Sequence, residues 1–537
     1  MADPETKRDL KRRDFLKLGA AAGVVGLLQA QGDAAQQPTT ATTPSTPVRP
    51  STTVPGVRRG GTFTMARPNS MQDFSGVWFT RGNTPFIPAL YNTLLRLDKD
   101  FNPQPELAES WQFSADGHVL SMKLRQGVKF HTGREFTAQD VKFSWSFGTE
   151  ERGGFGSQMR QMFRLITDVK TPDKYTVDLM FERPTPLVFD VLDTLAMFDQ
   201  SVANKINTTD AGSGPFMVAS YTPNADVRMK RFDGYWEPGK PYLDEYIVRT
   251  IPDTTALAVN LESKAVDAID GASLYDAVRL KAQPGIVCEV AAKQNVFHLA
   301  ANVRRQPLSD RRVRQAINYA IDRERCCKTV LQGTVEPTCL HWPRESWAHF
   351  RDLEGRYSQN LEKAKALLAE AGYSNGFETS ILVSKQYNDS LFGIGQIIQS
   401  DLAKIGIKAQ LKNVEATVYL TTWRKAEWDL AVHNYGRANR DPGTMLSGAV
   451  AFYTRAENGP PGFESAEFEK WRGEAASILD REKRKALYRK IQEFFLEDSF
   501  SMPIAADQTL WLYRDHIHGL SFTREACPFA SEVWLGG

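Results

Sequence analysis

The chain has 537 residues, a formal net charge of +2, 42% hydrophobic residues and 24% charged residues. These proportions are typical of a soluble globular protein, exclude a disordered chain and allow at least two sizeable cores. Near-neutrality argues against a dedicated nucleic-acid binder, and five cysteines in so long a chain do not make a disulfide framework. No apolar run reaches the roughly 20 residues of an ordinary membrane span.

The N-terminal residues are typical of an export signal. Arg12 and Arg13 begin the run Arg-Arg-Asp-Phe-Leu-Lys, and an uncharged, mostly apolar stretch follows at 18–28. A basic region before a short apolar region is the pattern of a secretory signal. The arginine pair also resembles the bacterial twin-arginine signal. We therefore expect residues 1–35 to be such a signal, with Arg12 and Arg13 as the residues that the export machinery reads.

The next segment, 36–57, is rich in Pro and Thr and has almost no large apolar side chain. It cannot offset the entropy of ordering by burial. We expect an extended linker between the signal and a folded body that begins near Arg58.

From Arg58 onward, strand-like and helix-like segments alternate. A capping-box spacing at Thr137 and Asp140 predicts the start of a helix, and Gly372 suits the left-handed position that ends one. The periodicity predicts strands at 61–66, 176–181 and 408–414, and helices at 141–147, 311–321 and 361–371. Mixed order of this kind predicts an α/β fold.

Two motifs resemble functional sites but lack necessary parts. Residues 234–240 fit the first seven positions of a phosphate-binding loop, but Pro238 and Pro241 stand where the motif needs a helix and a hydroxyl. His516 and His518 would share one face of a strand, but zinc usually takes three or four protein ligands. We therefore expect neither a nucleotide nor a metal here. No familiar catalytic motif is present, which disfavours an enzyme without excluding one.

A series of stretches points to one family. They are Ala-Leu-Tyr-Asn-Thr-Leu-Leu at 89–95, Leu-Ala-Glu-Ser-Trp at 107–111, the run 124–141, Gly-Ser-Gly-Pro-Phe at 212–216, Arg-Phe-Asp-Gly-Tyr-Trp at 231–236, and the run 307–323. In this order they resemble the family 5 extracellular solute-binding proteins, which are the peptide, nickel and opine receptors of ABC importers. The resemblance covers about 58–537.

The resemblance implies an α/β, two-lobed fold like that of periplasmic binding proteins (type II, cluster C), with an extra subdomain inserted in the first lobe. Lobe I would comprise 58–96, 207–292 and 507–537, the inserted subdomain 97–206, and lobe II 293–506. The two crossings between the lobes, near 292–296 and 503–507, would form a hinge. A ligand that contacts both lobes would bias such a hinge toward closure.

The function that the resemblance implies is that of a receptor. It would be a periplasmic, monomeric substrate-binding protein without cofactor, exported through the twin-arginine pathway. It would capture a peptide or peptide-like solute and deliver it to the permease subunits of an ABC importer at the inner membrane. Two alternatives stay open: a receptor for a non-peptide solute, such as an opine, an oligosaccharide or an acidic metabolite, and an exported enzyme.

One loop carries the expected ligand site. In peptide-binding relatives lobe II carries Gly-Trp-x-x-Asp followed by Asp-Pro, and the matching stretch here is 434–442. Tyr435 takes the aromatic place and Asp441 fits the Asp-Pro. Ala438 falls where the relatives keep the aspartate that holds the peptide's amine. Because a buried ammonium needs a charged partner, we expect weak affinity for ordinary free-amine peptides.

Other residues of this loop favour an anionic ligand. Arg437 and Arg440 would pair with a carboxylate or phosphate, unless they face solvent. Aromatic side chains could add stacking area, although a core position is an equal alternative for each. The expected ligand contacts are Tyr435, Arg437, Ala438, Asn439 and Asp441, together with Trp423, Phe74 and Trp78.

Overall fold

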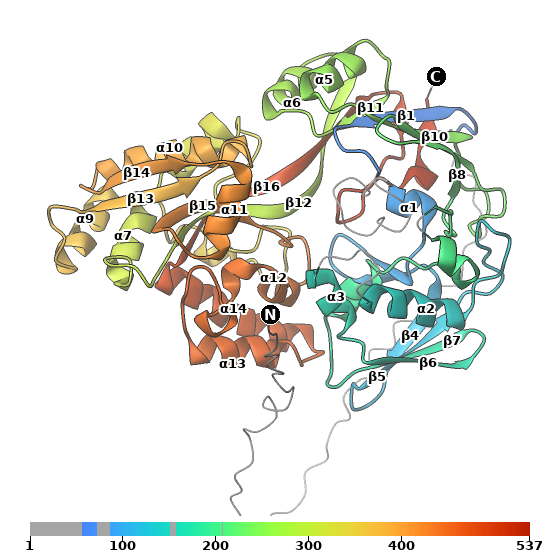
Figure 1. Ribbon diagram of the computed structural model, residues 1–537, viewed down its shortest axis with the longest axis horizontal. Helices are drawn as coiled ribbons and strands as arrows, with labels where there is room; N and C mark the ends of the chain where they lie inside the picture. Colours follow the sequence, from blue (N-terminus) through green and yellow to red (C-terminus); the bar gives the residue numbers. More distant parts are fainter. Residues whose placement is uncertain (1–55, 72–85, 151–156, 207, 537) are drawn as a thin grey trace, which may run out of the picture. The chain divides into compact units, whose positions relative to one another are not determined.

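A computed structural model of the chain describes residues 56–71, 86–150, 157–206 and 208–536 (Figure 1). The predicted signal, most of the predicted linker, Arg12, Arg13, Phe74 and Trp78 lie outside these residues. Within the described residues, no helix combines the length and the apolar character that crossing a membrane requires.

Most strands belong to one mixed sheet. Ten described strands pair in the order β14-β13-β15-β12-β16-β11-β1-β10-β9-β8. Their bounds are β1 Thr62–Arg67, β8 Phe216–Thr222, β9 Asp226–Arg231, β10 Glu245–Thr250, β11 Ala268–Asp270, β12 Ile286–Ala301, β13 Glu378–Val383, β14 Lys408–Asn413, β15 Leu430–Tyr435 and β16 Ser501–Arg514.

Two long antiparallel strands, β12 and β16, connect the two halves of this sheet. The end of β12, from Val296 to Ala301, pairs with β15, whereas the end of β16 pairs with β11. Figure 1 shows β12 and β16 running between the β13–β15 strands and the β1–β11 strands. Their own register shifts between Val290 and Ala292, between Ala292 and Asn295, and at Phe297/His298.

A second, four-stranded antiparallel sheet has the order β4-β5-β7-β6. The segment that contains it supplies part of the site described below. Its elements are β4 Ala108–Phe113, β5 Val119–Leu124, α2 Ala138–Thr149, α3 Ser157–Phe163, β6 Asp168–Asp173, β7 Thr176–Met180 and α4 Val188–Leu192. Two short pairs complete the described strands, β2 Leu95–Leu97 with β3 Pro103–Pro105, and β17 Ile517–His518 with β18 Trp534–Leu535.

The remaining described α-helices lie outside the segment of the second sheet. Beside the short α1 Ile87–Leu90 and α8 Arg323–Arg325, they are α5 Thr254–Glu262, α6 Leu274–Lys281, α7 Arg311–Ala320, α9 Leu361–Glu370, α10 Asp389–Ala403, α11 Ala416–Arg424, α12 Pro442–Gly448, α13 Ala466–Ala475 and α14 Arg481–Asp498.

The buried side chains gather in two large cores and two small ones. One large core contains residues between Val296 and Ala505, including the faces of α7, α10 and α14. The other lies mainly between Phe63 and Val248 and includes Trp511 from β16. The presence of two large cores agrees with the expectation from chain length. The exact lobe boundaries stay a prediction.

Most predicted elements are present. The segments 61–66, 176–181 and 408–414 overlap β1, β7 and β14, and the three predicted helices correspond to α2, α7 and α9. Thr137 and Asp140 form the predicted capping box, and Gly372 has φ +87°. Among the described residues, no helix follows the P-loop-like stretch 234–240 before β10, and no group of three metal-ligating side chains occurs.

Candidate functional site

The loop that follows β15 is packed tightly against neighbouring segments of the chain. Tyr435 is 3% exposed, and its hydroxyl donates a hydrogen bond of 2.8 Å to the carbonyl oxygen of His341. Arg437 has φ +68°, the left-handed conformation that lets the chain turn sharply before Ala438, which is fully buried. Gly448 makes room for the Arg437 side chain, because a Cβ at this position would lie 2.7 Å from Cδ of Arg437.

Asp441 closes this loop and starts α12. Its carboxylate accepts a hydrogen bond of 2.9 Å from the backbone of Gly443 and pairs with Arg484 of α14. Arg484 is 4% exposed and lies over the ring of Trp347. The pKa of Arg484 is raised by the neighbouring carboxylate of Asp441 despite burial. The Asp441 side chain therefore serves as a helix cap held inside lobe II, and its contacts are internal.

Arg440 points in the opposite direction and bridges two other segments. Its Nη1 lies 3.1 Å from the Asp193 carboxylate, and its Nε donates to Glu525 at 2.8 Å. Burial raises the pKa of Asp193 to about 6, whereas the carboxylates of Glu525 and Asp193 raise the pKa of Arg440 despite its burial. We take Arg440 and its two carboxylate partners to be charged at neutral pH, because both carboxylates contact one guanidinium that is 5% exposed.

Asp190 of α4 holds the start of α12. Its Oδ2 accepts hydrogen bonds from the Asp441 backbone at 2.9 Å and from the Thr444 hydroxyl at 2.6 Å. The side chain is 1% exposed, and its Oδ1 is buried without a hydrogen-bond partner. Burial without a partner is costly for a carboxylate oxygen, so this atom is a candidate contact for a ligand.

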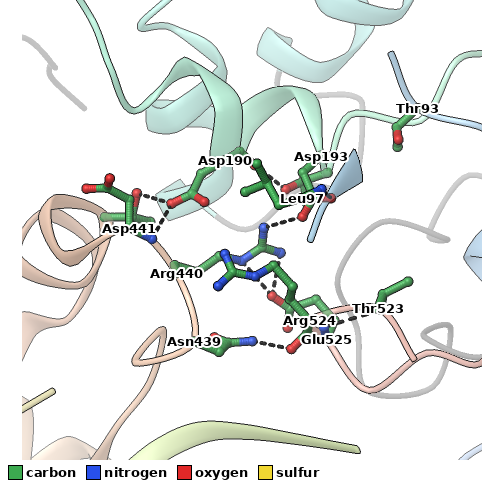
Figure 2. A network of polar contacts seen from close by, with 12 residues as sticks. Thr93, Leu97, Asp190, Asp193, Asn439, Arg440, Asp441, Thr523, Arg524 and Glu525 are labelled. Carbon is green, nitrogen blue, oxygen red and sulfur yellow. Dashed lines mark hydrogen bonds and ion pairs between the residues drawn. The ribbon is translucent and has the colours of Figure 1, made fainter. Parts of the chain in front are cut away.

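A third segment, at Thr523–Glu525, completes the network in Figure 2. The Asn439 amide donates to the carbonyl oxygen of Arg524. The Arg524 guanidinium lies 3.4 Å from the centroid of the Phe101 ring, and its Nη1 is buried without a hydrogen-bond partner. Burial lowers the pKa of Arg524, with Arg440 acting in the same direction.

The remaining predicted residues occupy different surroundings. Trp423 is 2% exposed, with its ring stacked on Trp428 and His433 at centroid distances of 4.8 and 4.1 Å. It therefore occupies a core position, one of the two alternatives. Arg437 is half-buried, and its Nη1 lies 3.0 Å from Sδ of Met162. Neither Arg437 nor Arg440 faces open solvent, and Arg440 is occupied by protein carboxylates.

Sequence reasoning missed the partners of the loop. Asp190, Asp193, Arg524 and Glu525 were not among the expected residues. The spacing of three residues between Asp190 in α4 and Asp193 at its C-cap was the available signal, because residues three apart on a helix share a face. No comparable signal marks Arg524 and Glu525, since they contact Asn439 and Arg440, which lie 85 residues away in the sequence.

The chain matches the family model for bacterial extracellular solute-binding proteins, family 5 (middle), over residues 102–453. It is 28% identical over 446 residues to the heme-binding protein A of Haemophilus influenzae, covering 78% of this chain and 81% of that protein. It is also 28% identical over 491 residues to the dipeptide-binding protein of Escherichia coli, covering 84% and 90%.

Two solved structures share the fold over nearly their whole length. The periplasmic binding protein DppA of Helicobacter pylori, in complex with the peptide STSA, gives a TM-score of 0.72 at 25% identity, covering 89% of this chain and 99% of that one. HbpA2 of Haemophilus parasuis gives a TM-score of 0.79 at 25% identity, covering 89% and 100%.

Proposed function

Because the chain belongs to the bacterial extracellular solute-binding proteins of family 5, we propose that it is the substrate-binding protein of an ABC importer for a peptide or peptide-like solute. It is a receptor, not an enzyme. In this proposal the solute lies between lobe I (58–96, 207–292 and 507–537) with its inserted subdomain (97–206) and lobe II (293–506). The closed receptor then presents the solute to the permease subunits.

The observation that carries the proposal is the likeness to proteins with peptide ligands. The Helicobacter relative is described as associated with an ABC transporter and holds a tetrapeptide, and the Escherichia relative is named for dipeptides. The network around Arg440 supports a closing mechanism, because it joins a loop of the proposed lobe II to α4 of the inserted subdomain and to the C-terminal part of lobe I. A receptor that closes on its ligand needs contacts that form in the closed state.

A non-peptide solute is the second candidate. The observation that favours it is Ala438, which stands where peptide-binding relatives carry an aspartate. An opine, an oligosaccharide or an acidic metabolite would not need that carboxylate. Arg437 and Asn439, which belong to the same loop, remain our proposed contacts to the solute, together with Phe74 and Trp78 from the segment after β1.

The test is to identify the solute that the protein retains. We expect native mass spectrometry of the full chain, purified from the exporting cell, to show a bound solute whose fragmentation identifies a peptide. Adding that solute to the stripped protein should raise the melting temperature and reduce the radius of gyration in solution scattering, because binding to the native state stabilises it. A bound sugar or opine would establish the second candidate. Tight binding without compaction would contradict closure between lobes.

We also propose that the receptor reaches the periplasm through the twin-arginine pathway. Arg12 and Arg13 would be read as a pair, so replacing both with Lys should leave the precursor in the cytoplasm. Cell fractionation with immunoblotting provides the measurement. Normal export of the double variant would point to the general secretory route instead.

A further inference from the structure

We propose that Asp190 and Arg524 are the two anchors of a peptide-like solute that carries a free ammonium and a free carboxylate. Oδ1 of Asp190 would accept hydrogen bonds from the ammonium, and Nη1 of Arg524 would donate to the carboxylate. This inference rests on the proposed receptor function and names the chemistry of its site.

Asp190 is held rigidly and still has an unused acceptor. Its Oδ2 is engaged by the Asp441 backbone and the Thr444 hydroxyl, at 2.9 and 2.6 Å, which fixes the carboxylate plane. Oδ1 is buried and unpartnered, in a side chain that is only 1% exposed. An ammonium is the natural partner of such an atom, because a charge-assisted hydrogen bond offsets the burial of the carboxylate.

Arg524 has a buried donor that lacks an acceptor. Phe101 covers one face of its guanidinium, and the neighbouring Arg440 repels it. Its Nη1 is buried without a hydrogen-bond partner, and within the described part of the chain no ion pair engages this guanidinium. A carboxylate would satisfy this donor and would also reduce the repulsion between the two arginines.

The two unsatisfied groups belong together. Asp190 is the strongest of the charged influences on Arg524, yet no ion pair joins them in the described structure. Figure 2 shows Arg524, on the segment that also carries Glu525, with its side chain beside that of Arg440. The other charged groups of this network already have partners, since Arg440 pairs with Asp193 and Glu525, and Asp441 pairs with Arg484. A zwitterionic solute would complete the two groups that do not.

This arrangement revises the expectation from the sequence. Ala438 lacks the carboxylate that peptide-binding relatives place at that position, and the sequence alone therefore predicts weak binding of free-amine peptides. In our proposal Asp190 supplies the missing carboxylate from the inserted subdomain, on the other side of the loop. Free-amine peptides then remain suitable ligands despite Ala438.

The test uses the purified, solute-free full chain and a short-peptide hydrolysate of casein in three forms: untreated, N-acetylated, and converted to methyl esters. Captured peptides are counted by mass spectrometry after gel filtration. We expect capture from the untreated mixture, and roughly tenfold to a hundredfold weaker capture from each blocked form, the range that a hydrogen bond to a charged group supports. Asp190→Asn should remove the preference for a free amine, and Arg524→Gln the preference for a free carboxylate.

Matched controls use an exposed ion pair of lobe II. Asp352→Asn and Arg489→Gln make the same chemical changes and should leave both preferences intact. Asp190→Glu, which retains the charge, and circular dichroism of each variant separate loss of an anchor from loss of the fold.

Three results would contradict the inference. Equal capture of free and blocked peptides by the wild type would overturn it and leave the receptor function standing. Unchanged preferences in folded Asp190→Asn and Arg524→Gln would assign the anchoring to other residues. Failure of the wild type to capture peptides from any mixture would refute the peptide proposal itself, and the inference with it.

Discussion

Arg484 shows how one side chain fixes the position of the site loop. It is buried in lobe II, pairs with the carboxylate that caps α12, and lies over the rings of Trp347 and Tyr488. Through Asp441 it sets the place where the loop meets Asp190, because the backbone of Asp441 donates to that carboxylate. The geometry of this contact thus depends on an arginine whose own hydrogen bonds go to Ala475, Asp441 and Tyr488.

Replacing Arg484 with Met should therefore be strongly destabilising. The change leaves Asp441 buried without its cation, and removing one partner of a buried pair costs about 3–5 kcal/mol. Arg489 on the same helix is the control, since its side chain is 40% exposed and pairs with the exposed Asp352. Arg489→Gln should cost less than about 1 kcal/mol. Urea unfolding of both variants provides the comparison, and similar small losses would show that Asp441 does not depend on Arg484.

The site was predictable at this scale only in part. The resemblance drew attention to 434–442, which the structure places from the end of β15 to the start of α12, but it could not show which way each side chain points. The Asp441 side chain turns inward because it pairs with Arg484, which lies 43 residues later in the chain. Its backbone contacts the carboxylate of Asp190, which lies 251 residues earlier. Local sequence carries no information on such pairings. Trp423 illustrates the same limit, because a buried aromatic and a ligand-stacking aromatic have the same sequence signal.

At the scale of elements, local sequence signals predicted helices and strands better than they predicted the contacts of individual side chains. Helix α7 follows from the apolar stripe of Val313, Ile317 and Ala320, and its N-cap Asp310 accepts a hydrogen bond from the backbone of Arg312. Among the described residues no helix follows 234–240 before β10, as the prolines of this stretch predict. What the sequence could not indicate is that β12 continues over 16 residues and joins two halves of the sheet. Its partners are strands that lie far away in the chain.

The two parts of β12 should differ in local stability. Residues 296–301 lie between β15 and β16, whereas 286–292 pair with β16 alone among the described strands, and the register shifts occur between 290 and 295. A strand with one partner and interrupted pairing opens more readily. The exposed side chains of Val287 and Val290, at 36% and 45%, agree with weaker packing there.

Hydrogen-exchange mass spectrometry can measure this difference. We expect amides at 286–295 to exchange at least roughly tenfold faster than those at 296–301, as expected for local opening without global unfolding. The same crossing contains the proposed hinge at 292–296, so a bound ligand should slow exchange there. Uniform protection along β12 would argue that the crossing is rigid and that closure uses another segment.

At the scale of the whole molecule, the proposed lobe II contains three buried histidines that must stay neutral. Burial lowers the pKa of His341 and of His433 to about 3, and lowers the pKa of His298 well below its ordinary value. Their hydrogen bonds agree with neutral rings. His341 Nδ1 lies 3.0 Å from the side-chain amide nitrogen of Gln492. The oxygen of the same amide already accepts a hydrogen bond from the His341 backbone. The amide nitrogen is therefore the donor and the ring nitrogen the acceptor.

These histidines should make the protein sensitive to mild acid. In the unfolded chain they bind protons below their ordinary pKa of about 6.5. In the folded chain burial lowers the pKa of His341 and of His433 to about 3, and lowers the pKa of His298 as well. The unfolded state thus holds more protons within this window. The free energy of unfolding should fall as the pH drops through it, by up to about 1.4 kcal/mol per pH unit for each histidine. Above about pH 6.5 this contribution should be constant.

Denaturant unfolding across the window from neutral pH to about pH 4.5 tests this, and a histidine variant identifies the source. His341→Gln removes one titrating ring, so its stability should fall less steeply with acid than that of the wild type, even if its stability at neutral pH is lower. His518→Gln, at an exposed position, serves as the control and should keep the wild-type slope. If His341→Gln and the wild type lose stability in parallel, other groups must cause the acid sensitivity. If the histidines cause the acid sensitivity, the lobe that contains them should unfold first as the pH falls. Hydrogen exchange of residues 296–301, compared at near-neutral and at acidic pH, would reveal this unfolding. This strand carries His298 and pairs with the strand of His433.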